Sequence, residues 1–399
     1  MSFSEIKKYL AFIIFSLILF TLMLFIENNN GKFDTEDFKV FYLAAKALFS
    51  GEQVYGISFG LDTGYYKYSP FILIVLSSYT LFTFKIASII HFFLTVFSAI
   101  FSIIILEQLI AKYLFKVKKQ HIYTSLLILL SVLLHFVRDL HMGNVNIILL
   151  FLMILALKFS LESKEIAAGI LIALVILTKP YFIILGIPFL IFKKHKTVFS
   201  IAISGISLTL LTAIILGFST SLNLHLDWFK AMLEHSDYLY SPYTVTYLLD
   251  YYLGLALPKN IDLPLFGLIT LLVSAYFYKI SRTETLIEHN KSLVFSFFIL
   301  IGIIPNLLIT DVEHFLFSLP LISIVILYLQ QIRKYYWTIL FIIVIFIYGG
   351  NSSDLVGNDL SLKIKFWGFV GIGNLMIICA AICIYLNRNE WGKSELGNN

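Results

Sequence analysis

Long apolar runs alternate with short polar segments along nearly the whole chain. A helix that crosses the hydrocarbon core of a bilayer needs about 20 apolar residues. Thirteen runs of the sequence approach or reach that length, and we therefore expect an all-α, polytopic membrane protein. The runs cover residues 9–26, 70–84, 86–111, 121–137, 144–160, 166–178, 180–192, 197–217, 263–280, 292–309, 314–329, 336–348 and 366–386.

Basic residues between the runs indicate which runs span the membrane, because Lys and Arg concentrate in cytoplasmic loops. If all thirteen runs crossed, the clusters at residues 112–119 and 193–196 would face opposite sides. If residues 70–84 instead form an interfacial or re-entrant segment, the tight basic clusters, Lys7-Lys8 included, all face the cytoplasm. We therefore predict about twelve membrane helices in one domain over residues 1–399, with both termini cytoplasmic, in the cell (plasma or inner) membrane.

Composition supports the membrane assignment and excludes other classes. Hydrophobic residues make up 59% of the 399 residues, charged residues 13%, and the mean hydropathy is +0.90, far from the values of a soluble domain. The net charge of +5 is spread over short clusters between apolar runs, so we expect membrane lipids and no nucleic acid as partners. The first run is too long for a signal peptide and indicates an uncleaved anchor. Cys379 and Cys383 lie one turn apart within the last run and are interpreted as packing residues.

Two long polar segments are expected on the external side, at residues 27–85 and 218–261. The first carries Asp34, Glu36 and Asp37. Apolar residues then recur with helical spacing, which predicts an interfacial amphipathic helix after Asp37. A partly desolvated carboxylate at this position could act as a general base. A helix cap or a solvated acidic loop would explain the same residues.

Ionisable residues at the edge of a membrane helix are a hypothesis of function by default. A first cluster holds Arg138, Asp139, His141, Asn144 and Asn146. It would either bind a substrate or anchor a hairpin to the interface.

Two further polar positions lie between apolar runs. Lys179, directly before Pro180, could bind a phosphate or extend its side chain to the interface. Asp311, Glu313 and His314 form a turn in which the His could bind a phosphate or a sugar hydroxyl. No H-E-x-x-H or paired D-x-D pattern is present, so no metal is expected.

The second external segment is rich in Tyr, Trp and His, which suits either stacking on a sugar or a place in the interfacial aromatic belt. The chain has no G-x-S-x-G, Walker A or Rossmann motif, which argues against serine hydrolases and nucleotide-driven proteins.

Short motifs follow one another in order over most of the chain. The first external segment contains Asp37-Phe38, Phe41-Tyr42, Ala44-Ala45, Gly51 and Val54-Tyr55. The later ones are Tyr68-Ser69-Pro70-Phe71, Gly143-Asn144-Val145-Asn146, Ala168-Gly169 with Lys179-Pro180, and Glu313-His314 with Pro320.

In this order the motifs resemble those of the GT-C superfamily of membrane glycosyltransferases, specifically glycosyltransferase family 87, a mannosyltransferase-like group. The family patterns are D-F-x-x-Y-Y-x-A-A…G…Y, Y-P-P, G-Q-V-N, A-G…K-x-x-P and a late acidic-His turn. This chain departs from them in having Ser69 for a proline, Asn144 for a glutamine, and a shortened segment after Lys179.

The resemblance implies a GT-C fold and the transfer of a sugar, with mannose as one candidate, from a polyprenyl-phosphate donor. The acceptor would be a hydroxyl of a glycolipid or glycan at the outer membrane face, and the reaction would invert the anomeric carbon without a cofactor or a metal. Asp37 would be the catalytic base, and Lys179, Arg138 and His314 would stabilise the donor phosphate. The remaining candidate substrate-binding residues are Tyr42, Tyr68, Asn144, Asn146 and Glu313.

Two other classes fit a twelve-helix membrane protein. A transporter or lipid flippase would place polar sites near the midplane, whereas here the polar residues gather at one face, with Glu107 as the clearest exception. A ligase or polymerase of lipid-linked glycans would share an external basic site.

Overall fold

A computed structural model of the chain provides the coordinates. It describes residues 3–60, 64–115, 123–234, 241–255, 257–258, 261–283, 285–308, 311–332, 335–349 and 353–387. Parts of the predicted basic clusters, at residues 116–119, 333–334 and 388–393, lie outside the described residues. The same holds for residues 235–240, 256 and 259–260 of the second external segment.

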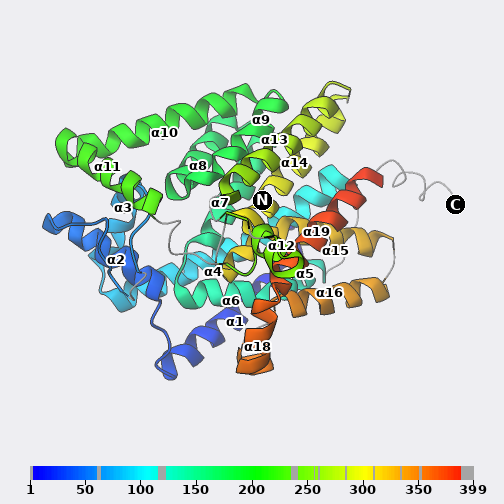
Figure 1. Cartoon of the computed structure of the whole chain (residues 1–399), viewed down its shortest axis with the longest axis horizontal. Helices are drawn as coiled ribbons and strands as arrows, with labels where there is room; N and C mark the ends of the chain where they lie inside the picture. The colour runs from blue at the N-terminus through cyan, green and yellow to red at the C-terminus, as the bar shows by residue number, and fades with distance from the viewer. Residues whose placement is uncertain are drawn as a thin grey trace.

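The described residues are helical almost throughout, apart from one isolated bridge between Ser58 and Tyr65 (Figure 1). The prediction of an all-α polytopic chain is thereby confirmed. In chain order the elements are α1 (Phe3–Asn29), α2 (Glu36–Ser50), α3 (Pro70–Leu76), η1 (Ser77–Leu81), α4 (Phe84–Leu109), η2 (Ile110–Phe115), α5 (Thr124–Ser131), α6 (Leu133–Met142), α7 (Asn146–Leu161), α8 (Glu165–Thr178), η3 (Pro180–Leu185), α9 (Gly186–Ile191), α10 (His195–Leu216), α11 (Phe218–Glu234), α12 (Val245–Leu253), α13 (Asp262–Ser281), α14 (Leu286–Leu307), η6 (Val312–Ser318), α15 (Leu319–Gln331), α16 (Tyr335–Gly349), α17 (Ser353–Val356), α18 (Asn358–Phe366) and α19 (Phe369–Leu386).

Fewer helices than predicted are long enough to span a bilayer unaided. Among the described residues, seven helices have the length and apolar character of a span, and the bent pair of α5 and α6 would make eight. The run predicted at residues 121–137 is interrupted because Val132 leaves the helical conformation, and the two helices meet at 61°. Residues 70–81, 146–161, 165–178 and 180–191 form shorter apolar helices.

The bundle has buried central helices and outer helices whose apolar side chains are exposed, as they would be toward lipid. In the span that joins η6 to α15, 89% of the apolar window is buried inside the protein, against 11% in α10. Helix α8 packs between α7 and α10. Its contact with α10 is close at Gly169, where a Cβ atom would lie 2.4 Å from Cβ of Ser200. Small residues at such contacts are how helices pack closely in lipid, where no hydrophobic force drives them together.

Helix α2 confirms the helical spacing predicted after Asp37, but its apolar face packs on the protein. Phe38, Phe41 and Ala45 are buried, and α2 contacts α3 and η1. The segment at residues 70–81 supplies this apolar partner, so α2 need not rest on lipid alone. Helices α2, α3 and α11 gather at one end of the molecule, next to α10 (Figure 1).

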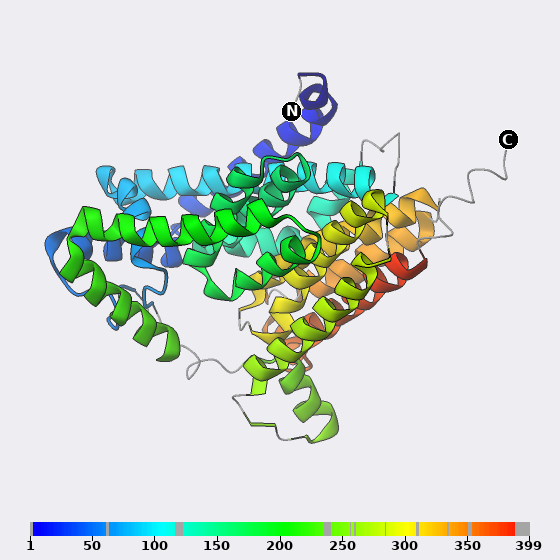
Figure 2. The ribbon, with the colours of Figure 1, turned by 90° about the horizontal axis from the view of Figure 1, so that it is seen from above.

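The described part of the second polar segment is mainly helical. Helix α11 turns away from the end of α10 at Gly217, whose φ is 84°, and runs toward α3 (Figure 2). The Trp228 indole Nε1 donates a hydrogen bond to the backbone oxygen of Lys67, 3.0 Å away. The first and second polar segments therefore contact each other at this side chain.

Candidate active site

The site begins at the first turn of α2. Thr35 precedes the helix in a left-handed conformation, with φ of 43°, and its hydroxyl donates to Ser88 Oγ of α4 at 3.2 Å. A left-handed conformation is uncommon for a β-branched residue and marks a constrained position. Glu36 and Asp37 follow in the first turn, where the helix dipole favours carboxylates. Asp37 is thus held at a fixed start of a helix, although Thr35 makes no side-chain cap.

The junction of α6 and α7 supports the Asp37 carboxylate. Asn144 Nδ2 donates to Asp37 Oδ2 at 2.7 Å, and Asn144 Oδ1 accepts from the Val145 N–H at 2.7 Å. Gly143, with φ of 67°, ends α6 and touches α2, because a Cβ there would lie 2.7 Å from Cβ of Phe38 and 2.9 Å from Cβ of Thr35. A glycine is therefore required both by the left-handed turn and by the approach of α2.

Asn146 connects a buried carboxylate to a lysine. Its Nδ2 donates to Asp139 Oδ1 at 2.8 Å, and its Oδ1 accepts from Lys179 Nζ at 2.6 Å. Asp139 Oδ2 also accepts from the Ile147 N–H, 3.2 Å away, at the start of α7. A carboxylate only accepts and an ammonium only donates, so these partners fix the orientation of the Asn146 amide.

Lys179 lies where α8 ends. The residue before a proline avoids the helical conformation, and Lys179 accordingly adopts φ of −136° and ψ of 98° before Pro180. Its Nζ lies 2.7 Å from His314 Nε2. Because the ammonium must donate, Nε2 accepts, and the proton of the neutral ring sits on Nδ1, which lies 3.3 Å from the Asp311 backbone oxygen.

Arg138 and Glu313 form an ion pair beside this lysine. Arg138 Nε lies 3.2 Å from Glu313 Oε2, but the geometry does not make a hydrogen bond. The Glu313 side chain is 7% exposed and that of Arg138 is 60% exposed. The guanidinium therefore covers a buried carboxylate and still presents donors to the surroundings.

Burial and neighbouring charges shift the acidity of the groups in the loops. Burial, together with the charge of Asp311, raises the pKa of Asp37 from 3.8 to about 6, against the opposing influence of Lys179, Asn144 and Lys67. Burial lowers the pKa of Lys67, while Asp311 and Asp37 oppose that shift. A carboxylate with a pKa near 6 is a suitable general base at neutral pH.

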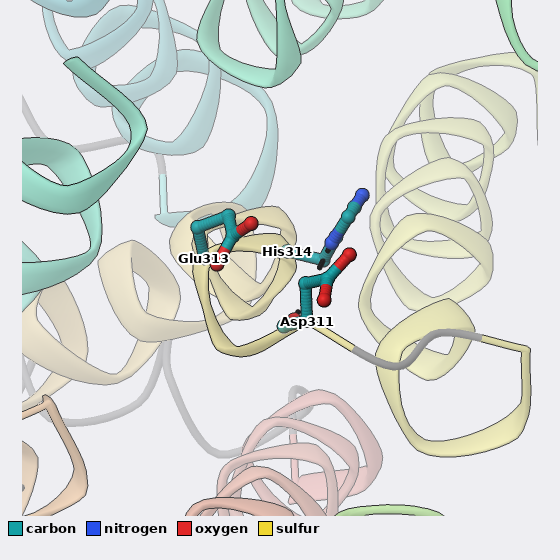
Figure 3. Close-up of side chains that lie close together, drawn as sticks. All are labelled: Asp311, Glu313 and His314. Atoms are coloured by element: carbon teal, nitrogen blue, oxygen red, sulfur yellow. Dashed lines mark hydrogen bonds between the residues drawn. The ribbon is translucent and has the colours of Figure 1, made fainter. Parts of the chain in front are cut away.

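The turn before α15 has donor atoms that a metal ion could use. One ligand atom each of Asp311, Glu313 and His314 lies within 4.8 Å of the others, and Figure 3 shows the Asp311 carboxylate next to the His314 ring. Two cationic side chains already occupy this group, since Lys179 donates to His314 Nε2 and Arg138 pairs with Glu313. The donor set therefore fits a protein ammonium better than a metal ion.

Most of the residues predicted from the sequence lie in three small groups that are close enough for their charges to interact. Hydrogen bonds or ion pairs connect members of three groups: Asp37 with Asn144; Asn146 with Lys179 and His314; and Arg138 with Glu313. Burial and the charges of Asp37, Tyr181 and Asp139 hold the pKa of the Tyr68 hydroxyl well above its usual range.

Tyr42 is not part of these groups. Its hydroxyl donates to the Phe82 backbone oxygen at 2.8 Å, and Lys46 Nζ lies 5.0 Å from the centre of its ring. Its side chain therefore joins α2 to the segment before α4. Sequence reasoning missed Lys67, which stands next to Tyr68 without a motif of its own, and His91, which is one polar residue within an apolar run.

A comparison with protein-family models confirms the resemblance to glycosyltransferase family 87. A model of glycosyltransferase family 87 matches residues 66–304, a range that includes Arg138, Asn146 and Lys179 but neither Asp37 nor His314. A comparison with curated protein sequences finds no match. Among solved structures, the chain is similar to ArnT from Cupriavidus metallidurans bound to undecaprenyl phosphate, with 12% identity and a TM-score of 0.38, over 95% of this chain and 77% of that one.

Proposed function

This chain belongs to glycosyltransferase family 87, and from that premise we propose that it transfers a sugar from a polyprenyl-phosphate donor to an acceptor hydroxyl at the external membrane face. The observation that carries the proposal is that Asp37, a carboxyl group with a raised pKa, is bonded to Asn144, while Lys179 is bonded to Asn146, two residues further along the chain. The acceptor is a glycolipid or glycan, and mannose is the first sugar to test.

The acceptor half of the reaction takes place at Asp37. The acceptor oxygen attacks the anomeric carbon while its proton passes to Asp37 Oδ1, because Oδ2 is held by Asn144. The bond from the anomeric carbon to the phosphate oxygen breaks on the opposite side, so the configuration inverts. Asn144 orients the carboxylate, which favours a fixed direction of proton transfer.

The donor half takes place at Lys179. Breaking the glycosidic bond returns an electron pair to the lipid phosphate, which leaves with an added negative charge. A phosphate is already a good leaving group, so it requires charge stabilisation more than protonation. Lys179 supplies a point charge and the exposed Arg138 a planar set of donors. Neutral His314 accepts from Lys179 and thereby positions it.

An apolar cavity beside the C-terminal part of α8, the helix that ends just before Lys179, suits the isoprenoid chain of the donor. It measures about 570 Å³ and lies between α8, η3, α9 and α10, with Leu177, Ile183 and Gly205 among its walls. Leu177 precedes Lys179 by two residues, so a lipid chain in the cavity would end near the ammonium. We therefore place the lipid of the donor between α8 and α10.

Replacement of the base tests the chemistry. Asp37→Asn keeps an oxygen that accepts from Asn144 but removes the proton acceptor, so transfer should fall by about two orders of magnitude or more. The assay is incorporation of radiolabelled sugar by purified protein in liposomes. Asp34→Asn, an exposed change in the segment leading to α2, is the matched control and should retain activity. Full turnover by Asp37→Asn would remove Asp37 from the mechanism.

Filling the cavity tests the donor site. No heavy atom lies within 4 Å of a Cβ built at Gly205, so Gly205→Phe places its ring in open space. We expect a higher KM for a long polyprenyl donor and little change for a donor with two or three isoprene units. Gly267→Phe on α13 is equally unobstructed, lies outside the cavity and should change neither value. Equal effects of Gly205→Phe on both donors would place the lipid elsewhere.

Two further measurements separate this function from its alternatives. In the liposome assay, movement of unmodified donor lipid across the bilayer without sugar incorporation would indicate a flippase. Treatment with a chelator should leave transfer unchanged, because Lys179 and Arg138 already neutralise the acidic turn. If chelation abolished activity and Mn²⁺ or Mg²⁺ restored it, a metal ion, and not Lys179 with Arg138, would balance the charge of the acidic turn.

A further inference from the structure

His91 of α4 contacts both supports of the Asp37 carboxylate. Its Nε2 lies 3.2 Å from the Asn144 backbone oxygen, and its ring stacks on Phe38 with centroids 4.6 Å apart and planes inclined by 22°. Asn144 holds Asp37 through its side chain, and Phe38 is the next residue in the chain. The imidazole is 2% exposed, so it has no direct access to a substrate.

The hydrogen bonds define the state of this ring. A backbone oxygen can only accept, so Nε2 carries a proton. Nδ1 lies 3.2 Å from the Tyr79 hydroxyl and accepts from it when the ring is neutral. Tyr79 also meets Phe38 edge-to-face, with centroids 4.9 Å apart. His91 and Tyr79 therefore enclose Phe38 and orient the Asn144 peptide.

We propose that His91 and Tyr79 are positioning residues that set the direction of the Asp37 carboxylate through Asn144 and Phe38. This inference rests on the proposed function, in which Asp37 receives the acceptor proton. A small displacement of the carboxylate would weaken proton transfer more than donor binding, because the contacts of Lys179 do not pass through His91. Loss of the positioning contacts should therefore lower kcat and leave the donor KM nearly unchanged.

Two substitutions of His91 separate positioning from packing. His91→Phe keeps an aromatic ring against Phe38 and removes both hydrogen bonds. His91→Gln keeps an N–H donor for Asn144 and an acceptor for Tyr79 but removes the ring. We expect His91→Phe to lower kcat by about tenfold or more with the donor KM changed less than about twofold, and His91→Gln to recover much of that loss.

Tyr79→Phe tests the same contact with less risk to folding, because it removes one hydroxyl. Tyr385→Phe is the control: Tyr385 is buried more deeply than Tyr79, and its hydroxyl is likewise hydrogen bonded to a side chain, that of Ser292. Tyr79→Phe should lower kcat several-fold, and Tyr385→Phe should leave it unchanged. Each variant is purified in detergent, and its folding is checked by size-exclusion chromatography and thermal unfolding.

The outcomes distinguish this inference from the function on which it rests. Wild-type protein that transfers no sugar would overturn the proposed function. If the wild-type is active and the folded His91→Phe variant keeps its full kcat, the positioning role is overturned. It is also overturned if His91→Phe and His91→Gln lose kcat equally and both raise the donor KM. If His91→Phe does not fold, Tyr79→Phe decides: a lower kcat than that of Tyr385→Phe supports the role, and an unchanged kcat overturns it.

Discussion

At the scale of single residues, two asparagines that are two positions apart in the chain bind side chains of opposite charge. Asn144 donates to Asp37, and Asn146 accepts from Lys179. Neutral amides between a carboxylate and an ammonium keep the two charges apart and oriented, so neither charge is consumed by a direct ion pair. This separation leaves Asp37 able to accept a proton and Lys179 able to meet a phosphate.

The pH dependence of transfer should report the protonation of Asp37. Its pKa is raised to about 6, because burial and Asp311 disfavour the ionised form. The base must be ionised, so kcat should rise to a plateau near pH 7 and fall about tenfold per pH unit well below pH 6. A rate profile between pH 4.5 and 8.5 measures this limb. A profile that stays flat down to pH 5 would contradict the raised pKa.

The same shift predicts an effect on stability with a defined sign. A carboxyl group whose pKa is higher in the folded state stabilises that state below its unfolded pKa, and this contribution is lost as pH rises through about 6. Ionised Asp37 therefore destabilises the fold at pH 8. Asp37→Asn should melt at the same or a higher temperature than wild-type at pH 8, with the difference shrinking at pH 5. A markedly lower melting temperature at pH 8 would show that Asp37 mainly stabilises the fold.

Removal of the Lys179 charge should affect donor binding first. Lys179→Met keeps the length of the side chain and removes the ammonium that faces Asn146 and His314. A hydrogen bond involving a charged group contributes about 1.5–3 kcal/mol, so the donor KM should rise by about 10- to 100-fold. Lys194→Met, at an ion pair with Glu165 on the predicted cytoplasmic side, is the control. An unchanged donor KM in Lys179→Met would favour an interfacial role for this lysine.

At the scale of elements, the turn between α6 and α7 determines where α2 begins. Gly143 lets the backbone of that turn touch Thr35 and Phe38, and Asn144 then reaches Asp37. The first polar segment is therefore located by a turn about 100 residues later in the chain. Packing of this kind has no local signature in the first segment itself.

Gly143→Ala should displace α2. The added Cβ would meet two Cβ atoms at 2.7 Å and 2.9 Å, and its φ of 67° is unfavourable for alanine. Gly31→Ala is the control, because Gly31 has φ of 64° and no atom within 4 Å of a built Cβ. Both variants should lose about 1 kcal/mol of stability from backbone strain. Only Gly143→Ala should also lose most of its kcat; equal kcat values would mean that α2 tolerates the shift.

The sequence could predict the helices and much of the site, for separate physical reasons. Apolar runs of membrane length predict helices without reference to their neighbours, which is why α1, α10, α13 and α19 appear close to the expected positions. Motif order predicts Asp37, Asn144 and Lys179 as site residues, and the structure joins Asp37 to Asn144. The break at Val132 and the support from His91 depend on contacts between distant segments, and neither leaves a periodic pattern in the sequence.

At the scale of the whole molecule, buried helices are surrounded by helices with exposed apolar side chains. Helix α10 is largely exposed and α14 is buried, as expected for a bundle that meets lipid on its outside. A second polar network joins α19 and the second polar segment to α14. In it, Asn374 Nδ2 donates to Asn306 Oδ1 at 2.5 Å, and Asn306 Nδ2 donates to the Tyr243 backbone oxygen at 3.2 Å. Ser318 of η6 also bonds to Asn374, which connects the acidic turn to that network.

The orientation in the membrane can be measured directly. The predicted distribution of basic clusters places both termini in the cytoplasm and the Asp37 cluster outside. Single cysteines introduced at Gly31 and at Ser2, in a variant with Cys379 and Cys383 replaced by serine, should differ in labelling of intact cells by a membrane-impermeant maleimide. The cysteine at position 31 should be labelled and that at position 2 protected. The reverse result would place the site on the cytoplasmic side.

The two-residue step from Asn144 to Asn146 also bears on how donor preference could change over evolution. The peptide backbone of this step sets the spacing between the Asp37 carboxylate and the Lys179 ammonium. Gly143 and Asp139 fix the two ends of that backbone. In the proposed reaction, the sugar ring would lie between these two points and would not need to touch the asparagines. Mutations in the surrounding walls could therefore exchange one sugar for another while the reaction geometry is inherited unchanged.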